Sequence, residues 1–322
     1  MHATSVATIC ITLAASPLAA REISLIPPID CDLGTDCFVQ QYVDHDPSPA
    51  AMDFHCAPLS YDAHKGTDFA LRSIAQMQAG VNVIAPAPGV VTGTRNGMRD
   101  EIFTAERVAE IDGRDCGNGV AVNHGDGWTA QYCHLKQGSV TVKTGDRLNR
   151  SDVIGQVGLS GKTQFPHVHM TLRKDGVVVD PFDPDGQITC GAPSSDSLWQ
   201  TPLPYLPGGI LSVGFADAVP EFNDIKAGRA ATDTLPTDAS ALVVFGYAFG
   251  GQADDAINLQ IVGPDGEFMS QTVTLAKNQA QFFRAIGKKH RTGWTPGVYT
   301  GTVSLIRGTQ IVSTAQGSVT IR

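Results

Sequence analysis

Two short stretches of the chain carry residue types that can hold a metal ion. The first is His64-Lys65-Gly66-Thr67-Asp68, and the second, His167-Val168-His169, follows about a hundred residues later. Zinc binds imidazole nitrogen and carboxylate oxygen, and a catalytic zinc keeps three protein ligands and leaves a fourth position to water. His64 and Asp68 can supply two ligands, and one histidine of the later pair can supply the third. The sequence therefore predicts a split zinc site with one Zn²⁺ per chain.

The spacing within each stretch is that of one face of a strand. Side chains at i, i+2 and i+4 of a strand point the same way, so His64 and Asp68 would share a face. Fully extended, their Cα atoms would lie about 13 Å apart, which is too far for two ligands of one ion. We expect Gly66 to permit a bend and to leave room for the ion. His167 and His169 can both point into one groove, one binding metal and the other standing beside the water.

Alternating residues predict the strands that would position these groups. Val120, Val122 and His124 alternate, a Gly-Asp-Gly turn follows at 125–127, and the alternation resumes from Trp128 to His134. Two alternating runs around such a turn are typical of a β-hairpin. This hairpin would bring His134 to the end of a strand, on the same face as Trp128.

The start of the chain and its cysteines indicate export to the periplasm or the extracellular space. Residues 1–20 have a short apolar core and the small residues of a cleavage site, although they contain no Lys or Arg. Beyond Cys10 the chain has an even number of cysteines, which favours disulfides in an exported protein. Bridges between Cys31 and Cys37 and between Cys116 and Cys133 are plausible, and the spacing alone fixes no pairing. The six are Cys31, Cys37, Cys56, Cys116, Cys133 and Cys190.

Composition excludes several classes of protein. The 322 residues are 42% hydrophobic and 17% charged, which suits a globular chain of one or two domains. The net charge of −9 argues against nucleic acid as a partner. After removal of the signal segment, no stretch is apolar enough to predict an integral membrane span.

The pattern of strands and turns predicts an all-β chain in two parts. The later part repeats the alternation, for example at Ile257, Leu259 and Ile261, and a Pro-Asp-Gly turn follows at 264–266. Short strands between turn signals favour a small β-sandwich-like domain. The predicted segments are a signal peptide at 1–20, a leader at 21–60, a metal-binding domain at 61–185, a Pro/Gly-rich linker at 186–209 and the sandwich-like domain at 210–322.

Three motifs in order resemble one known family. His-Lys-Gly-Thr-Asp at 64–68, Tyr-Cys-His-Leu at 132–135 and His-Val-His at 167–169 are similar to those of the lysostaphin/LytM-type zinc endopeptidases, over roughly residues 60–185. The resemblance implies an antiparallel β-sheet with a narrow groove and the cleavage of peptide bonds in bacterial peptidoglycan. It implies His64, Asp68 and His169 as zinc ligands. It also implies His134 and His167 as catalytic histidines that bind no metal. Phe165 stands where family members commonly have glycine, which bears on substrate preference.

The chemistry of amide hydrolysis suggests roles for these two histidines. A base must take a proton from water, and charge on the carbonyl oxygen must be stabilised. The chain has no His-Glu-x-x-His motif, so the glutamate base of that motif is missing. Histidine, with an ordinary pKa near 6.5, suits proton transfer near neutrality. We expect His134 and His167 to flank the water, with one or both acting as base and hydrogen-bond donor.

Three functions are compatible with these patterns. The first is an exported zinc metalloendopeptidase that hydrolyses peptide crosslinks or stem-peptide bonds of peptidoglycan. The second is a LytM-like non-catalytic regulator of another wall hydrolase, a class that lacks some zinc ligands, whereas all are present here. The third is a wall-binding protein with a structural zinc, which usually has four protein ligands. The oligomeric state and the role of the sandwich-like domain do not follow from the sequence.

Overall fold

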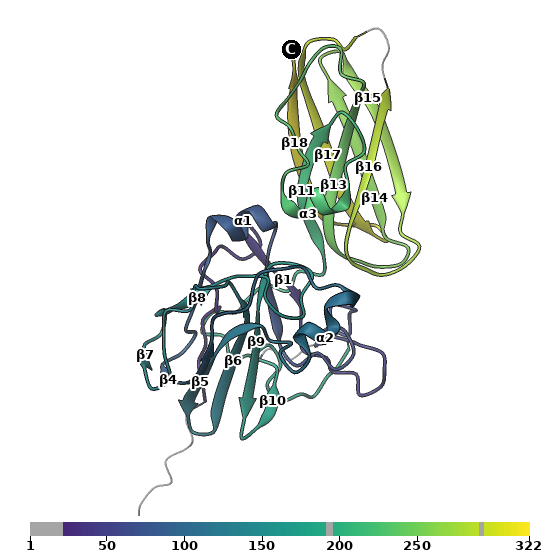
Figure 1. Cartoon of the computed structure of the whole chain (residues 1–322). Helices are drawn as coiled ribbons and strands as arrows, with labels where there is room; N and C mark the ends of the chain where they lie inside the picture. Colours follow the sequence, from purple (N-terminus) through teal and green to yellow (C-terminus); the bar gives the residue numbers. More distant parts are fainter. Residues whose placement is uncertain (1–21, 191–195, 290–292) are drawn as a thin grey trace, which may run out of the picture.

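The protein folds into two lobes joined end to end (Figure 1). The structure, a computed structural model, describes residues 22–190, 196–289 and 293–322. The predicted signal segment at 1–20 lies outside the described residues. Within the described ranges, no helix combines the length and the apolar character that crossing a bilayer requires.

The first lobe is built on one eight-stranded antiparallel sheet. Its strand order is β1-β2-β9-β6-β5-β4-β7, and β10 pairs with β9 off this path. The strands β3 and β8 form a separate small antiparallel pair. The elements are β1 Cys37–Gln41, β2 Thr67–Leu71, α1 Ile74–Ala79, β3 Asn82–Ile84, β4 Gly89–Arg95, the 3-10 helix η1 Ala105–Arg107, α2 Val108–Ile111, β5 Asn118–Gly125, β6 Trp128–Leu135, β7 Arg147–Leu148, β8 Val153–Gln156, β9 His167–Lys174 and β10 Val177–Val179. The predicted antiparallel β fold and the β5–β6 hairpin are confirmed.

Alternation along the central strands separates a core face from a groove face. On β9, Val168, Met170 and Leu172 are fully or almost fully buried in the core of the first lobe. The residues that alternate with these three, His167 and His169 included, face the other side of the sheet, where they line the groove described below. A strand with side chains of two kinds on its two faces therefore carries both the core and the site.

The leader at 21–60, whose sequence lacks clear periodicity, takes part in the sheet. β1 pairs antiparallel with β2 at the edge of the sheet, Phe38 opposite Ala70. Tyr42 and Phe54 from the leader are buried in the same core as the central strands. The irregular pattern of residues 21–60 reflects short pieces that each bury one or two large side chains, which gives no periodic signal.

The segment after the first lobe is also anchored to it. Leu198 and Trp199 are buried in the core of the first lobe. The backbone of Leu25 forms a parallel bridge with Trp199, with a hydrogen bond of 2.8 Å from Leu25 N–H to the Leu198 carbonyl. The described part of the predicted linker at 186–209 is therefore a strap across the first lobe.

Three disulfides join the six cysteines outside the N-terminal segment. Cys31–Cys37 and Cys116–Cys133 are the two bridges that the spacing made plausible. The third bridge, Cys56–Cys190, spans a sequence separation of 134 residues and ties the leader to the start of the strap. A bridge over such a long loop restricts the unfolded chain and stabilises the fold on that account.

The second lobe consists of two sheets around a core of its own. A three-stranded sheet has the order β11-β13-β16, and a five-stranded sheet has the order β12-β18-β17-β14-β15. The alternating Ile257, Leu259 and Ile261 on β14 are all buried between the sheets. The elements are β11 Gly209–Ala216, α3 Phe222–Ala227, β12 Thr234–Leu235, β13 Ala241–Gly251, β14 Ala256–Gly263, β15 Gly266–Thr274, β16 Gln279–Lys289, β17 Gly297–Arg307 and β18 Gln310–Ile321. The predicted sandwich-like architecture is confirmed.

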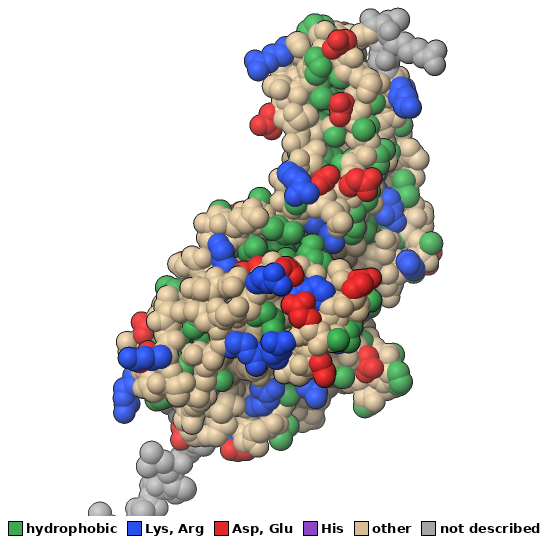
Figure 2. Space-filling model, viewed as in Figure 1, with side chains coloured by type: hydrophobic (Ala, Val, Ile, Leu, Met, Phe, Trp, Pro, Cys, Tyr) green, Lys and Arg blue, Asp and Glu red, His purple; other side chains and the backbone are tan. Residues whose placement is uncertain are grey.

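An apolar cluster lies at the junction of the two lobes. Phe38 on β1 packs against Phe249 on β13, with ring centroids 4.3 Å apart. Ala70 from the first lobe and Leu211, Ile225, Phe245 and Tyr247 from the second complete the buried cluster. Figure 2 shows hydrophobic side chains gathered at this junction, with charged side chains on the adjoining face of the first lobe. Burial of these large side chains favours a fixed arrangement of the lobes.

Candidate metal centre and its groove

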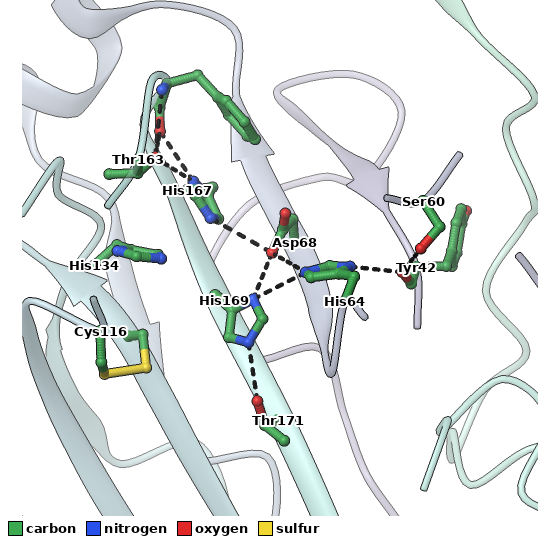
Figure 3. A network of polar contacts seen from close by, with 12 residues as sticks. Tyr42, Ser60, His64, Asp68, Cys116, His134, Thr163, His167, His169 and Thr171 are labelled. Carbon is green, nitrogen blue, oxygen red and sulfur yellow. Dashed lines mark hydrogen bonds and ion pairs between the residues drawn. A yellow bond between two sulfur atoms is a disulfide. The ribbon is translucent and has the colours of Figure 1, made fainter. Parts of the chain in front are cut away.

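Three side chains converge at one point on the groove face of the first lobe (Figure 3). The Asp68 Oδ1 atom lies 2.8 Å from His169 Nδ1 and 3.3 Å from His64 Nε2. The two nitrogen atoms are 3.1 Å apart. Within the described residues, this is the single group of His, Cys, Asp and Glu side chains close enough together to hold a metal ion.

The geometry of this cluster fits a zinc-sized ion. At bond lengths of about 2.0–2.1 Å, the ligand atoms of a tetrahedral zinc lie about 3.3 Å from one another. The three separations of 2.8–3.3 Å are within a few tenths of an ångström of that value. Two imidazoles and one carboxylate form a donor set that zinc accepts, and three ligands leave the fourth position of a catalytic site open.

Hydrogen bonds on the outer sides of the two imidazoles fix which nitrogen faces the cluster. His64 Nδ1–H donates to the Tyr42 carbonyl at 2.7 Å, so the Nε2 lone pair points at Asp68. His169 Nε2 lies 2.9 Å from Thr171 Oγ1, which leaves Nδ1 to face Asp68. Partners of this kind orient metal-ligating histidines and set their tautomers.

The backbone brings the three groups together as the sequence suggested, but Gly66 has a different purpose. Asp68 on β2 pairs directly with His169 on β9. His64 precedes the strand, and Gly66 lies between them. A Cβ atom on Gly66 would lie 2.6 Å from His169 Cε1 and Nε2 and 2.6 Å from the Met170 carbonyl oxygen. The missing side chain therefore makes room for the imidazole of His169.

A β-bulge turns His134 into the groove, and the prediction that it shares the face of Trp128 is wrong. Trp128 and Tyr132 point into the core, so strict alternation would bury His134 there. Between Tyr132 and Leu135, two residues of β6 (Cys133 and His134) lie opposite a single residue of β5, and His134 has a φ of +63°. An extra residue of this kind re-aims the side chains that follow it.

The bulge is held in place by its neighbours. The His134 N–H donates to the Cys116 carbonyl at 2.8 Å, and Cys116 is bonded to Cys133 by a disulfide. The His134 side chain is buried, and its Nδ1–H donates to the Ser160 carbonyl at 2.8 Å. Its other nitrogen points toward His167 and His169 (Figure 3).

His167 stands beside the cluster without belonging to it. Its Nδ1–H donates to the Phe165 carbonyl at 2.9 Å, and its Nε2 lies 3.4 Å from Asp68 Oδ1. The rings of His134 and His167 are 4.7 Å apart. The Phe165 ring stacks on the His167 ring at 4.4 Å, so the residue that replaces a family glycine packs directly on this histidine.

The charges of the site are set by burial and by mutual contact. Burial alone would raise the pKa of the Asp68 carboxyl, but the charges of His64 and His167 outweigh it and hold that pKa well below its usual range. Burial, together with the charges of His167 and His169, lowers the pKa of His134 well below 6.5. At neutral pH Asp68 is therefore a carboxylate and His134 a neutral imidazole with an open lone pair.

The cluster opens into a groove of about 1110 Å³. This volume is at the upper end of the range for small-ligand sites and leaves room for a peptide. One side of the groove comes from the second lobe, through Phe222 and Lys226 on α3 and residues 277–281 at the start of β16. This contribution could not be predicted from the sequence, because no motif links these residues to the histidines.

Comparison with known proteins identifies the region around the cluster. The family described as peptidase family M23 matches residues 62–181. The cell division protein DipM of Caulobacter vibrioides is 29% identical over 121 residues, which are 37% of this chain and 18% of that protein. The peptidoglycan DD-endopeptidase ShyA of Vibrio cholerae is 29% identical over 133 residues, 41% of this chain and 25% of that protein. The solved catalytic domain of lysostaphin from Staphylococcus simulans shares 23% identity over 37% of this chain and 77% of that domain, with a TM-score of 0.28.

The family match and the two curated relatives confirm the resemblance seen in the motifs. Residues 62–181 match the model of peptidase family M23, and this match supports the lysostaphin/LytM-type resemblance. The chain spans about a fifth to a quarter of the length of the curated relatives DipM and ShyA. The second lobe lies outside the matched residues.

Proposed function

We propose that the protein is an exported zinc metalloendopeptidase that cleaves peptide crosslinks or stem-peptide bonds of bacterial peptidoglycan. The observation that carries the proposal is the convergence of five side chains on one groove. His64, Asp68 and His169 form a three-ligand cluster, and two further histidines stand beside it with their outer nitrogens bound to backbone carbonyls. The relative named as a peptidoglycan DD-endopeptidase supports the choice of substrate.

The residues around the cluster suit the hydrolysis of an amide. A zinc ion held by His64, Asp68 and His169 would supply a Lewis acid for the scissile carbonyl and a water with a pKa near 7. His134 is neutral and presents an open lone pair to the groove, so it can take a proton from water. His167 Nε2 lies next to the cluster and can hydrogen-bond to the carbonyl oxygen as charge develops there. Either histidine can act as the base or as the hydrogen-bond donor.

A second candidate is a non-catalytic regulator of another wall hydrolase. One of the relatives reported above is named for cell division and not for hydrolysis. Against this candidate, both the three-ligand set and the two extra histidines are complete in this chain. A wall-binding protein with a structural zinc is a weaker alternative, because a structural site usually has a fourth protein ligand, and no fourth His, Cys, Asp or Glu joins the described group.

Digestion of purified peptidoglycan by the zinc-loaded protein tests the proposal. We expect new amino termini to appear, and none with the same protein after its metal is removed by a chelator. A zinc-loaded protein that releases no amino termini, but raises the activity of a separate wall hydrolase, would establish the regulator instead. Fractionation of the producing cells tests export, since the proposal places the protein outside the cytoplasm.

A further inference from the structure

The second lobe forms a wall of the groove that is fixed to the first lobe by partly buried hydrogen bonds. Gln40 on β1 donates its Nε2–H to the Ala280 carbonyl at 3.0 Å. Gln281 Nε2–H donates to Gln40 Oε1 at 2.9 Å, and the Tyr247 hydroxyl donates to Gln281 Oε1 at 2.6 Å. This chain of bonds holds the start of β16 against the edge of the catalytic sheet.

The helix α3 is fixed at the same junction. Its residue Ile225 is buried in the junction cluster. Gly228, which ends the helix with a φ of +78°, approaches Ser73 so closely that a Cβ atom on it would lie 2.9 Å from the Ser73 side chain. Arg72 donates from its guanidinium to the Leu211 carbonyl at 2.7 Å. The wall is therefore a built part of the groove and keeps its place beside the metal cluster.

The groove is lined by cations, although the chain as a whole is acidic. The net charge of the chain is −9. Around the groove, however, five basic side chains face only two acidic ones, and one of those two is the metal ligand Asp68. The basic residues are Lys65, Lys162, Arg173, Lys226 and Lys277. Among the described residues, none of these five cations has a carboxylate partner within 4.0 Å. Unpaired charges of one sign around a cleft attract ligands of the opposite sign.

Two of these cations come from the second lobe. Lys226 on α3 extends over the ring of Phe222, with Nζ 5.0 Å from the ring centroid, so its stem lies on an aromatic side chain that also lines the groove. Lys277 is exposed in the connection between β15 and β16. Both belong to the same groove as His134, His167 and His169.

We infer that Lys226 and Lys277 form a subsite for carboxylates of the peptide substrate, and that the second lobe sets a preference for anionic peptides. The inference rests on the proposed function, since it names a property of the substrate of that site. A peptide with free side-chain carboxylates binds across the groove with its acidic part on the wall from the second lobe. The same peptide with its carboxylates amidated loses this contact.

The test compares two forms of one substrate, cross-linked muropeptide dimers with free and with amidated side-chain carboxylates. The zinc-loaded wild-type protein is expected to have a lower KM for the free form. In the double variant Lys226→Gln/Lys277→Gln, the KM for the free form rises roughly three- to tenfold, the scale of two solvent-exposed ion pairs. The kcat and the KM for the amidated form stay within about twofold, and the preference of the wild type declines with added salt.

A matched control and a binding measurement separate the possible results. The variant Lys143→Gln/Lys289→Gln removes the same charge from two exposed positions outside the groove and should behave like the wild type. Calorimetric titration with an uncleaved stem peptide, free or amidated, reports the subsite without turnover. If the wild type cleaves neither dimer but binds the free peptide through the two lysines, the proposed function fails and the subsite stands. If the lysine variant keeps the wild-type preference in both measurements, the inference is overturned and the proposed function is unaffected.

Discussion

Each lobe contains an aspartate that is almost completely buried, and the two are partnered in different ways. Asp255 in the second lobe, 1% exposed, receives hydrogen bonds from Arg307 Nε and Nη2 at 2.9 and 2.8 Å. Asp68 in the first lobe, 2% exposed, faces three imidazoles, and no Lys or Arg among the described residues forms an ion pair with it within 4.0 Å. The charge of a buried carboxylate that is paired with a permanent cation is balanced within the protein. A buried carboxylate that faces imidazoles has metal-binding side chains around it in place of a permanent cation, and that distinguishes the candidate metal centre from a structural ion pair.

Removal of each carboxylate in turn tests this difference between the two aspartates. We expect Asp68→Ala to lose its bound zinc and to reduce peptidoglycan hydrolysis roughly 10³-fold or more, because a ligand of the ion is gone. We expect Asp255→Ala to keep both zinc and turnover but to lower the free energy of unfolding by about 3 kcal/mol, because Arg307 is left with an unpaired charge. Elemental analysis, hydrolysis assays and urea unfolding measure the three quantities. Equal zinc in Asp68→Ala and the wild type would remove Asp68 from the ligands.

The second prediction concerns the histidines that bind no metal. We expect His134→Ala to retain about one zinc per chain while kcat decreases roughly 10²-fold, the usual contribution of a general acid or base. The control is His124→Ala, in the same hairpin but outside the groove, where Nδ1 is bound to the Pro88 carbonyl. The proposed mechanism would be wrong if His134→Ala kept both its zinc and nearly full hydrolysis.

The third prediction concerns the glycine beside the cluster. A methyl group at Gly66 would overlap the His169 ring and the Met170 carbonyl, so we expect Gly66→Ala to displace that ligand. The affinity for zinc should decrease roughly 10- to 100-fold, the scale seen when the support of a metal ligand is disturbed. Competition with a chelator of known affinity measures it. Gly113→Ala is the control for loss of glycine: a Cβ there would meet no atom within 4 Å, and we expect its zinc affinity to stay as in the wild type.

The smallest expected effect concerns a third buried aspartate. His45 Nε2 lies 2.9 Å from Asp180 Oδ2, and the Asp180 side chain is fully buried. Burial by itself lowers the pKa of His45, but the hydrogen bond and charge of Asp180 outweigh it and raise that pKa. The pair therefore contributes fully below the unfolded pKa of about 6.5 and loses its contribution as the pH rises through the higher folded pKa.

This sign gives a measurable difference between two pH values. We expect His45→Gln to lower the free energy of unfolding by about 1 kcal/mol more at pH 6 than at pH 9, because the charge-assisted bond is present only at the lower pH. Urea unfolding at both values measures it. His124→Gln is the opposite control, since burial lowers the pKa of His124 and its contribution is lost as the pH falls. The same loss of stability at pH 6 and pH 9 would show that the charge on His45 is irrelevant.

Regular alternation made most of the fold predictable, and departures from it account for what the sequence could not show. Val120 and Val122 on β5 and Leu259 and Ile261 on β14 are buried at every second position, as the period of two predicts. His134 was recognised as a site residue by its motif, but its face was predicted wrongly. The bulge depends on the contact of its backbone with Cys116, which the local pattern of residues does not contain.

Contacts between distant segments could also not be predicted from the sequence. Nothing in the residues around α3 and β16 connects them with histidines more than fifty residues away, because the wall of the groove exists only after the two lobes have packed together. By contrast, the metal cluster depends on two short motifs and one sheet register, Asp68 opposite His169. Short local motifs therefore predict the metal cluster, whereas the shape of the groove depends on contacts between distant segments.

A fragment limited to the family match would lack the bridge between Leu25 and Trp199. The first strand of the sheet and the strap lie outside residues 62–181, yet both complete the core around the metal centre. Such a fragment would expose to water the core surface that packs against Leu198, Trp199 and Tyr42, and it would lack the Cys56–Cys190 disulfide. The smallest unit that keeps the core of the first lobe therefore runs from about Glu22 to about Leu206, about one and a half times as long as the family match.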